Sequence, residues 1–136
     1  MKYFIPLTLL FFIPVCLFAQ KKAVYKGTFS NGYKGDVITF NLSDDGKRLG
    51  NLTFKGYWRC SGTLEQITMG PEKSFSVKNG KVAGIITEPE NGGATAFRFD
   101  LNGTIGAKTA SGTLRINLNA LGCDTYLLKW TATRGG

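Results

Sequence analysis

Carboxylates are the side chains of this sequence that could most readily carry out a reaction. A pair of them, one as acid and one as base or nucleophile, cleaves the bond in most glycoside hydrolases. The candidates are Asp36, Glu65, Glu88, Glu90, Asp100 and Asp124. Most of these flank turns or fall on the polar side of alternating segments, which favours a structural role. We expect no catalytic residue among them.

Other reaction centres are disfavoured by composition. The sequence contains no histidine, which excludes Ser-His-Asp and Cys-His arrangements. Asp44-Asp45-Gly46 is acidic, but EF-hand spacing does not follow it, and Asp-Gly is typical of a hairpin turn. No glycine-rich loop leads into a helix where it could hold a phosphate. The sequence therefore predicts a protein that is not an enzyme and that uses no metal and no cofactor.

Aromatic side chains point to binding rather than catalysis. Tyr33 and Tyr57 are expected to face outward near basic residues, where such rings can bind sugars or partner proteins, and they form the candidate binding surface. The other large aromatics mostly share the parity of the apolar residues and are expected in the core. The alternative is a ligand cavity inside a small barrel, as in lipocalins and streptavidin, an interpretation that rests on analogy of fold.

The segments that must position these residues have the pattern of β-strands. Apolar and polar residues alternate, which gives each strand one buried and one exposed face, and no stretch has a sustained helical period. Asn79-Gly80 is the clearest hairpin turn, and a polar turn is expected at residues 108–111. The expected strands cover 24–29, 36–43, 48–60, 63–69, 74–78, 81–87, 97–105, 112–118 and 125–133.

Strands joined by tight turns pair with their sequence neighbours, so we expect an all-β fold, a single antiparallel meander of about eight or nine strands. The meander would close into a small β-barrel or fold into a β-sandwich, and closure would leave no exposed edge. One domain is expected at residues 20–136. Residues 63–69 alternate poorly and are expected to form an edge strand or to contain a bulge.

Residues 1–19 have the layout of a secretory signal peptide. Lys2 precedes an apolar run, and the small residue Ala19 stands directly before a polar segment. The run is short and contains two prolines, which does not favour a membrane span. Cleavage before Gln20 would export the protein to the periplasm or out of the cell. The alternative is lipid attachment at Cys16.

Cleavage would leave two cysteines, Cys60 and Cys123. An even number in an exported chain predicts one disulfide, with two buried thiols as the alternative. Zinc is not expected, because two cysteines without histidine cannot make a standard closed site.

The chain is basic, with a net charge of +8 that becomes +7 when Lys2 leaves with the signal peptide. Solubility is the simplest interpretation of this charge, and attraction to anionic lipids, acidic glycans or nucleic acid is the alternative. The basic residues are scattered along the sequence, and no run resembles a nucleic-acid-binding stripe, so nucleic acid is not an expected partner.

Several short motifs together resemble a known group of proteins. The most specific are Ala110-Ser111-Gly112-Thr113-Leu114 and Trp130-Thr131-Ala132, with Asn51-Leu52-Thr53-Phe54 before Cys60. The chain resembles a broad group of small exported bacterial β domains of unassigned function, with a signal peptide, many glycines and two cysteines. The resemblance covers nearly all of the mature chain. It implies an all-β fold, export and a cysteine pair, and it implies no activity.

The sequence thus predicts an exported, non-enzymatic β domain that acts as a binding or interaction module at the cell envelope. An envelope glycan, a small ligand and a protein all stay open as partners. The alternatives are a small-ligand-binding β-barrel and a structural or protease-inhibitor-like protein. An inhibitory loop would be expected at residues 69–71 or 88–93.

N-terminal sequencing of the exported protein tests the predicted signal peptide. The layout of residues 1–20 predicts that the mature chain begins at Gln20. A chain that begins at Met1, or at a lipid-modified Cys16, would contradict it.

Overall fold

The computed structural model describes residues 23–135, which form one antiparallel sheet of ten strands. The predicted signal peptide, residues 1–19, lies outside the described residues. In chain order the elements are β1 (Ala23–Phe29), β2 (Val37–Leu42), β3 (Arg48–Cys60), β4 (Thr63–Met69), β5 (Phe75–Lys78), β6 (Lys81–Glu88), β7 (Phe97–Ile105), β8 (Thr109–Leu118), the 3-10 helix η1 (Asn119–Leu121), β9 (Cys123–Asp124) and β10 (Leu128–Gly135).

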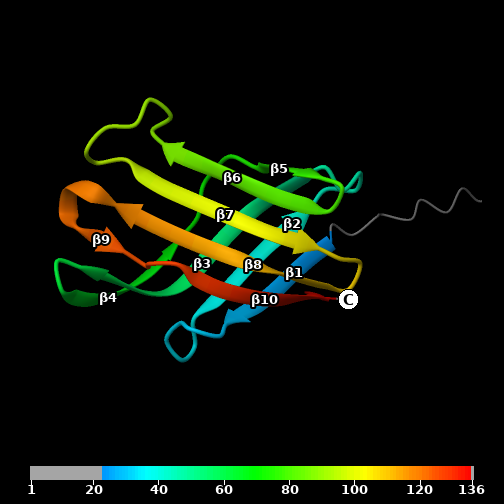
Figure 1. Ribbon diagram of the computed structural model, residues 1–136, viewed down its shortest axis with the longest axis horizontal. Coiled ribbons are helices and arrows are strands. Elements are labelled where there is room, and N and C mark those ends of the chain that lie inside the picture. The colour runs from blue at the N-terminus through cyan, green and yellow to red at the C-terminus, as the bar shows by residue number, and fades with distance from the viewer. Residues whose placement is uncertain (1–22, 136) are drawn as a thin grey trace, which may run out of the picture.

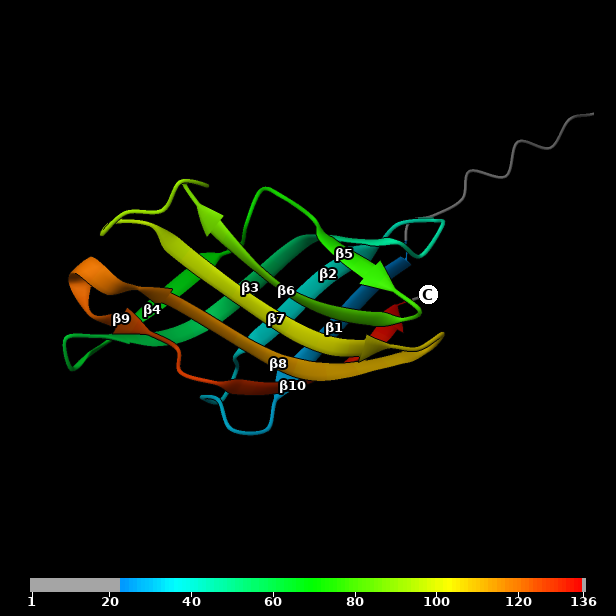
Figure 2. The same ribbon diagram turned by 45° about the horizontal axis from the view of Figure 1, so that its top comes forward.

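Eight of these strands form a ring of hydrogen-bonded neighbours in the order β1, β2, β3, β5, β6, β7, β8 and β10 (Figure 1). The last strand closes the ring, because β10 pairs with β1 along one edge and with β8 along the other. Figure 2 shows the strands β6, β7 and β8 crossing in front of β1, β2 and β3. The fold is therefore all-β and barrel-like, which confirms the predicted fold class.

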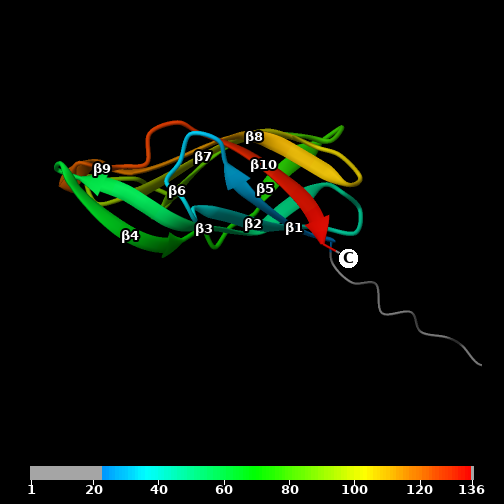
Figure 3. The same cartoon turned by 90° about the horizontal axis from the view of Figure 1, so that it is seen from below.

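Two strands lie outside the ring at one end of the molecule. The C-terminal half of β3 forms a hairpin with β4, and the short β9 pairs with both β3 and β8. Figure 3 shows β4 and β9 together at this end. Within residues 23–135, β4 pairs with β3 alone, so it is the edge strand that its irregular pattern predicted. Because β5 rather than β4 continues the ring after β3, the expected simple meander is interrupted here.

Aromatic side chains fill the ring where β10 closes it. The indole of Trp130 lies edge-on to Phe40 at 5.6 Å between ring centroids, and Phe40 stacks on Tyr25 at 5.1 Å. Two strands away, on β7, Gly103 leaves room for the indole, since a Cβ atom there would lie 2.7 Å from Trp130. These rings occupy space that a ligand would need in a carrier of the lipocalin type.

The disulfide Cys60–Cys123 is present, as the sequence predicted. The two residues are direct cross-strand partners on β3 and β9, with Cα atoms 3.9 Å apart. The bond fastens the end of the long β3 to the segment that leads into β10.

Two predicted strand boundaries are wrong, the start of the last strand and the start of β8. The expected last strand, 125–133, begins only at Leu128, because Tyr126 adopts a positive φ of 56° that interrupts the extended backbone. Tyr126 is therefore exposed instead of lying in the core. The turn expected at 108–111 is tighter than predicted, and β8 begins at Thr109 because Thr109 and Ala110 pair with β10. In both places, local alternation failed to show where the backbone pairs.

Loss of the disulfide should destabilise the fold. The bond closes a loop with a sequence separation of 63, and its removal should lower the free energy of unfolding by about 4 kcal/mol in a chain-entropy treatment. Urea unfolding of a Cys60→Ala, Cys123→Ala double variant measures this loss. An unchanged midpoint, or two titratable thiols in the unreduced mature protein, would contradict the assignment.

Candidate functional site

A pocket of about 280 Å³ lies where three segments meet: the loop after β1, the end of β3 and the connection from β9 to β10. We call it the tyrosine pocket. Its aromatic and polar lining comes from Asn31, Tyr33, Tyr57, Trp58, Arg59, Asp124, Thr125 and Tyr126. It lies on the outside of the ring, at the end of β1 where Phe29 leads into the following loop.

The structure brings together the two residues of the predicted binding surface. The rings of Tyr33 and Tyr57 meet edge-to-face, with centroids 5.7 Å apart and an interplanar angle of 63°. Tyr33 is 40% exposed and Tyr57 is half-buried. The pair therefore forms one continuous aromatic surface on the wall of the pocket.

Asn31 ties the loop that carries Tyr33 to the opposite wall. Its Nδ2 donates a hydrogen bond to the carbonyl of Leu127 at 2.9 Å, and its Oδ1 accepts one from the N–H of Lys129 at 2.7 Å. One side chain thus satisfies two backbone groups of the segment that leads into β10. These bonds hold two walls of the pocket in a defined position.

Asp36 holds the loop that carries Tyr33 from its buried side. It is only 2% exposed, and its Oδ2 accepts a hydrogen bond from the backbone N–H of Tyr33 at 3.0 Å. Burial raises the pKa of this carboxyl, and the backbone N–H groups of Tyr33 and Tyr57 act in the opposite direction. A Cβ atom at Gly56 would lie 2.5 Å from the carboxylate, so glycine is required beside it. Asp36 thus flanks the turn before β2, and its burial was not predicted from the sequence.

Asp124 orients the third tyrosine. Its carboxylate accepts hydrogen bonds from Nε of Arg115 at 3.1 Å and from Nη2 at 2.6 Å, which makes a bidentate ion pair. Hydrogen bonding to Asp124 and its charge raise the pKa of Arg115 above its ordinary value. The same carboxylate accepts the backbone N–H of Tyr126 at 2.7 Å, and this Asx-turn directs Tyr126 outward, where it is 61% exposed.

Sequence reasoning missed Tyr126 because its parity matches that of Leu128 and Trp130. A signal was present: an aspartate two residues before Tyr126 is typical of an Asx-turn, which ends regular alternation. Arg59 also lines the pocket and was not singled out; it is exposed and takes part in none of the ion pairs between described residues.

The other candidate carboxylates are distributed over several elements. Glu90 pairs with Lys73 at 2.9 Å, Asp100 lies 4.0 Å from Arg98, and Glu65 lies on the edge strand β4. Glu88 ends β6 and accepts the backbone N–H of Glu72 at 2.7 Å. Within residues 23–135, no group of three or more His, Cys, Asp and Glu side chains is placed to hold a metal ion. The absence of enzyme activity stays a prediction.

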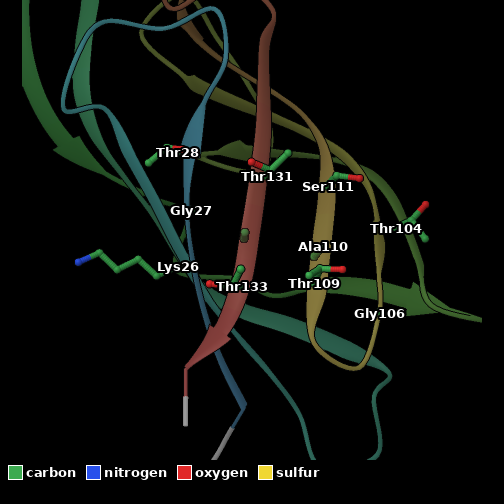
Figure 4. A pocket seen from close by; sticks show the side chains of 11 residues that line it. Lys26, Gly27, Thr28, Thr104, Gly106, Thr109, Ala110, Ser111, Thr131 and Thr133 are labelled. Carbon is green, nitrogen blue, oxygen red and sulfur yellow. The ribbon is translucent and has the colours of Figure 1, made fainter.

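A second hollow, of about 650 Å³, lies on the outer face where β1, β8 and β10 are adjacent. Figure 4 shows Thr109 and Ser111 on β8 beside Thr131 and Thr133 on β10, with Lys26 at the border. We call it the hydroxyl groove. It is larger than the tyrosine pocket, but short side chains and backbone line it, without an aromatic ring or an ion pair.

Comparison of the chain with protein families, with curated proteins and with solved structures found no match. The family resemblance inferred from the sequence therefore stays a prediction. Among the residues that the structure describes, no helix has the length and apolar character needed to cross a membrane.

The buried Asp36 should make the stability of the fold depend on pH. Because its pKa is raised in the folded state, its stabilising contribution is complete below the pKa of the unfolded chain and is lost as the pH rises through the folded pKa. An Asp36→Asn variant keeps an acceptor for the Tyr33 amide but cannot ionise. The stability of the variant relative to the wild type should therefore increase as the pH rises from below the ordinary carboxyl pKa of 3.8 into the neutral range. Urea unfolding across this range measures the difference, and a difference that is constant or falls with pH would contradict the account.

Proposed function

We propose that this protein is an exported, non-enzymatic binding domain that recognises a carbohydrate at the tyrosine pocket. The observation that supports this proposal most directly is the convergence of Tyr33, Tyr57 and Tyr126 with Arg59 around one small pocket. The signal-peptide pattern and the disulfide support export, which would bring the pocket into contact with envelope glycans.

The chemistry of the lining suits a sugar. A pyranose ring has an apolar C–H face, which packs on aromatic rings, and a rim of hydroxyl groups that need donors and acceptors. The edge-to-face pair of Tyr33 and Tyr57 offers both an aromatic surface and phenolic hydroxyls. The exposed guanidinium of Arg59 can donate to sugar oxygens without leaving a buried charge unpaired.

The pocket is also held in place before a ligand arrives. The Asn31 bonds to the opposite wall and the Asp124 bond to the Tyr126 amide fix the segments that carry the tyrosines. A preorganised site loses less conformational freedom on binding, which increases affinity. At about 280 Å³ the pocket lies near the lower end of the usual range for ligand sites, so a short saccharide fits it better than a large ligand.

Calorimetric titration with soluble oligosaccharides tests the proposal. The probes are trimers of N-acetylglucosamine, of β-linked glucose and of α-linked glucose. Wild-type protein should bind at least one of them, and Tyr57→Ala or Tyr33→Ala should weaken binding by about fivefold, since one lost aromatic contact costs on the order of 1 kcal/mol.

An Ile85→Ala variant serves as the control, because Ile85 is 53% exposed on β6 and does not line the pocket. It should bind as the wild type does. Absence of binding to all three probes, or equal losses in the control and the tyrosine variants, would contradict the proposal. Release of new reducing ends during incubation would contradict its non-enzymatic part.

A further inference from the structure

Positive charge gathers at one end of the ring, although the basic residues are scattered in the sequence. Three tight turns lie there, those that join β2 to β3, β5 to β6 and β7 to β8, together with the start of β1 and the end of β10 (Figure 1). We call this the basic end. Its basic residues, all exposed, are Lys26, Lys47, Arg48, Lys78, Lys81, Lys108 and Arg134.

The rest of the domain is electrically balanced. The basic end holds seven basic residues and two acidic ones, Asp44 and Asp45, whereas the remainder of residues 23–135 holds seven of each sign. The whole net charge of the described domain therefore lies at the basic end. The ion pairs between described residues, Lys73–Glu90, Arg98–Asp100 and Arg115–Asp124, all lie elsewhere.

The charges surround the end of the ring instead of following one strand. A depression of about 450 Å³ opens there, and Lys47, Gly80, Gly106 and Arg134 line it from four different segments, together with the acidic Asp45. Tyr25 contributes to its lining and donates a hydrogen bond to the Gly106 carbonyl at 2.6 Å. A linear polyanion is bound best by a stripe of charge. Charges that surround one end of a domain fit a flat anionic surface better.

We propose that the basic end docks the protein on the surface of a bilayer that contains anionic phospholipids. Lysine and arginine side chains near such a surface are attracted to it, and the attraction acts within about one Debye length, roughly 10 Å at moderate salt. In the sequence, Lys21 and Lys22 directly precede β1, which adds two basic residues to this part of the chain. The tyrosine pocket lies at the other end of β1, so a docked molecule turns it away from the bilayer.

Co-sedimentation of the mature protein with lipid vesicles tests this proposal. Vesicles of phosphatidylcholine and phosphatidylglycerol should bind the protein, vesicles of phosphatidylcholine alone should not, and added salt should release it. A variant with Lys78→Gln, Lys81→Gln and Lys108→Gln should partition into the pellet at least about tenfold less.

The matched control carries Lys34→Gln, Lys55→Gln and Lys129→Gln, which remove the same charge from exposed positions away from the basic end. Its partition into the vesicle pellet should fall by less than about threefold. Equal losses in the two variants would show that net charge alone acts and would overturn the proposal. Absence of vesicle binding, or binding to heparin or DNA in its place, would also overturn it. Saccharide binding is measured separately, so either proposal can fail while the other holds.

Discussion

Closure of the ring by β10 is the constraint on which the rest of the structure depends. β10 pairs with β1 and β8 at once, so its alternate side chains lie inside and outside the ring. Trp130 points inward, and its indole fits because Gly103, two strands away on β7, has no side chain. Truncation of a buried tryptophan typically costs about 3–5 kcal/mol. Without β10 the sheet would keep two open edges, which proteins normally cover.

Ring closure also separates two surfaces of different chemistry. β1 begins at the basic end and ends at Phe29, directly before the loop that carries Asn31 and Tyr33. The bond from the Lys129 amide to Asn31 then ties this loop to the start of β10. Charge at one end and aromatic rings at the other are therefore held apart by the length of the same strand. The disulfide supports the aromatic end, since it fixes β9 beside β3.

Alternation in the sequence was sufficient to predict the fold class, and the bounds of β3 and β4 agree with the predicted 48–60 and 63–69. It could not predict the pairing of β5 with β3, because the two strands are far apart in the sequence and alternation describes only the faces of a single strand. Tyr33 and Tyr57 could be identified as exposed rings, but the loop that brings them together is held by Asp36, whose burial no local pattern showed. Tyr126 was missed because a single positive φ turns its side chain outward. The basic end was missed because only the topology brings its scattered basic residues together.

The claim that ligand binds outside the ring, on the tyrosines, is tested most directly by nuclear magnetic resonance. Backbone amide shifts of the labelled protein would be followed during titration with the best-binding oligosaccharide. The account predicts that the largest changes cluster at residues 31–36, 57–59 and 124–127, which form the tyrosine pocket. Changes centred on Thr109, Ser111 and Thr131 in the hydroxyl groove, or on core residues such as Phe40 and Trp130, would contradict it.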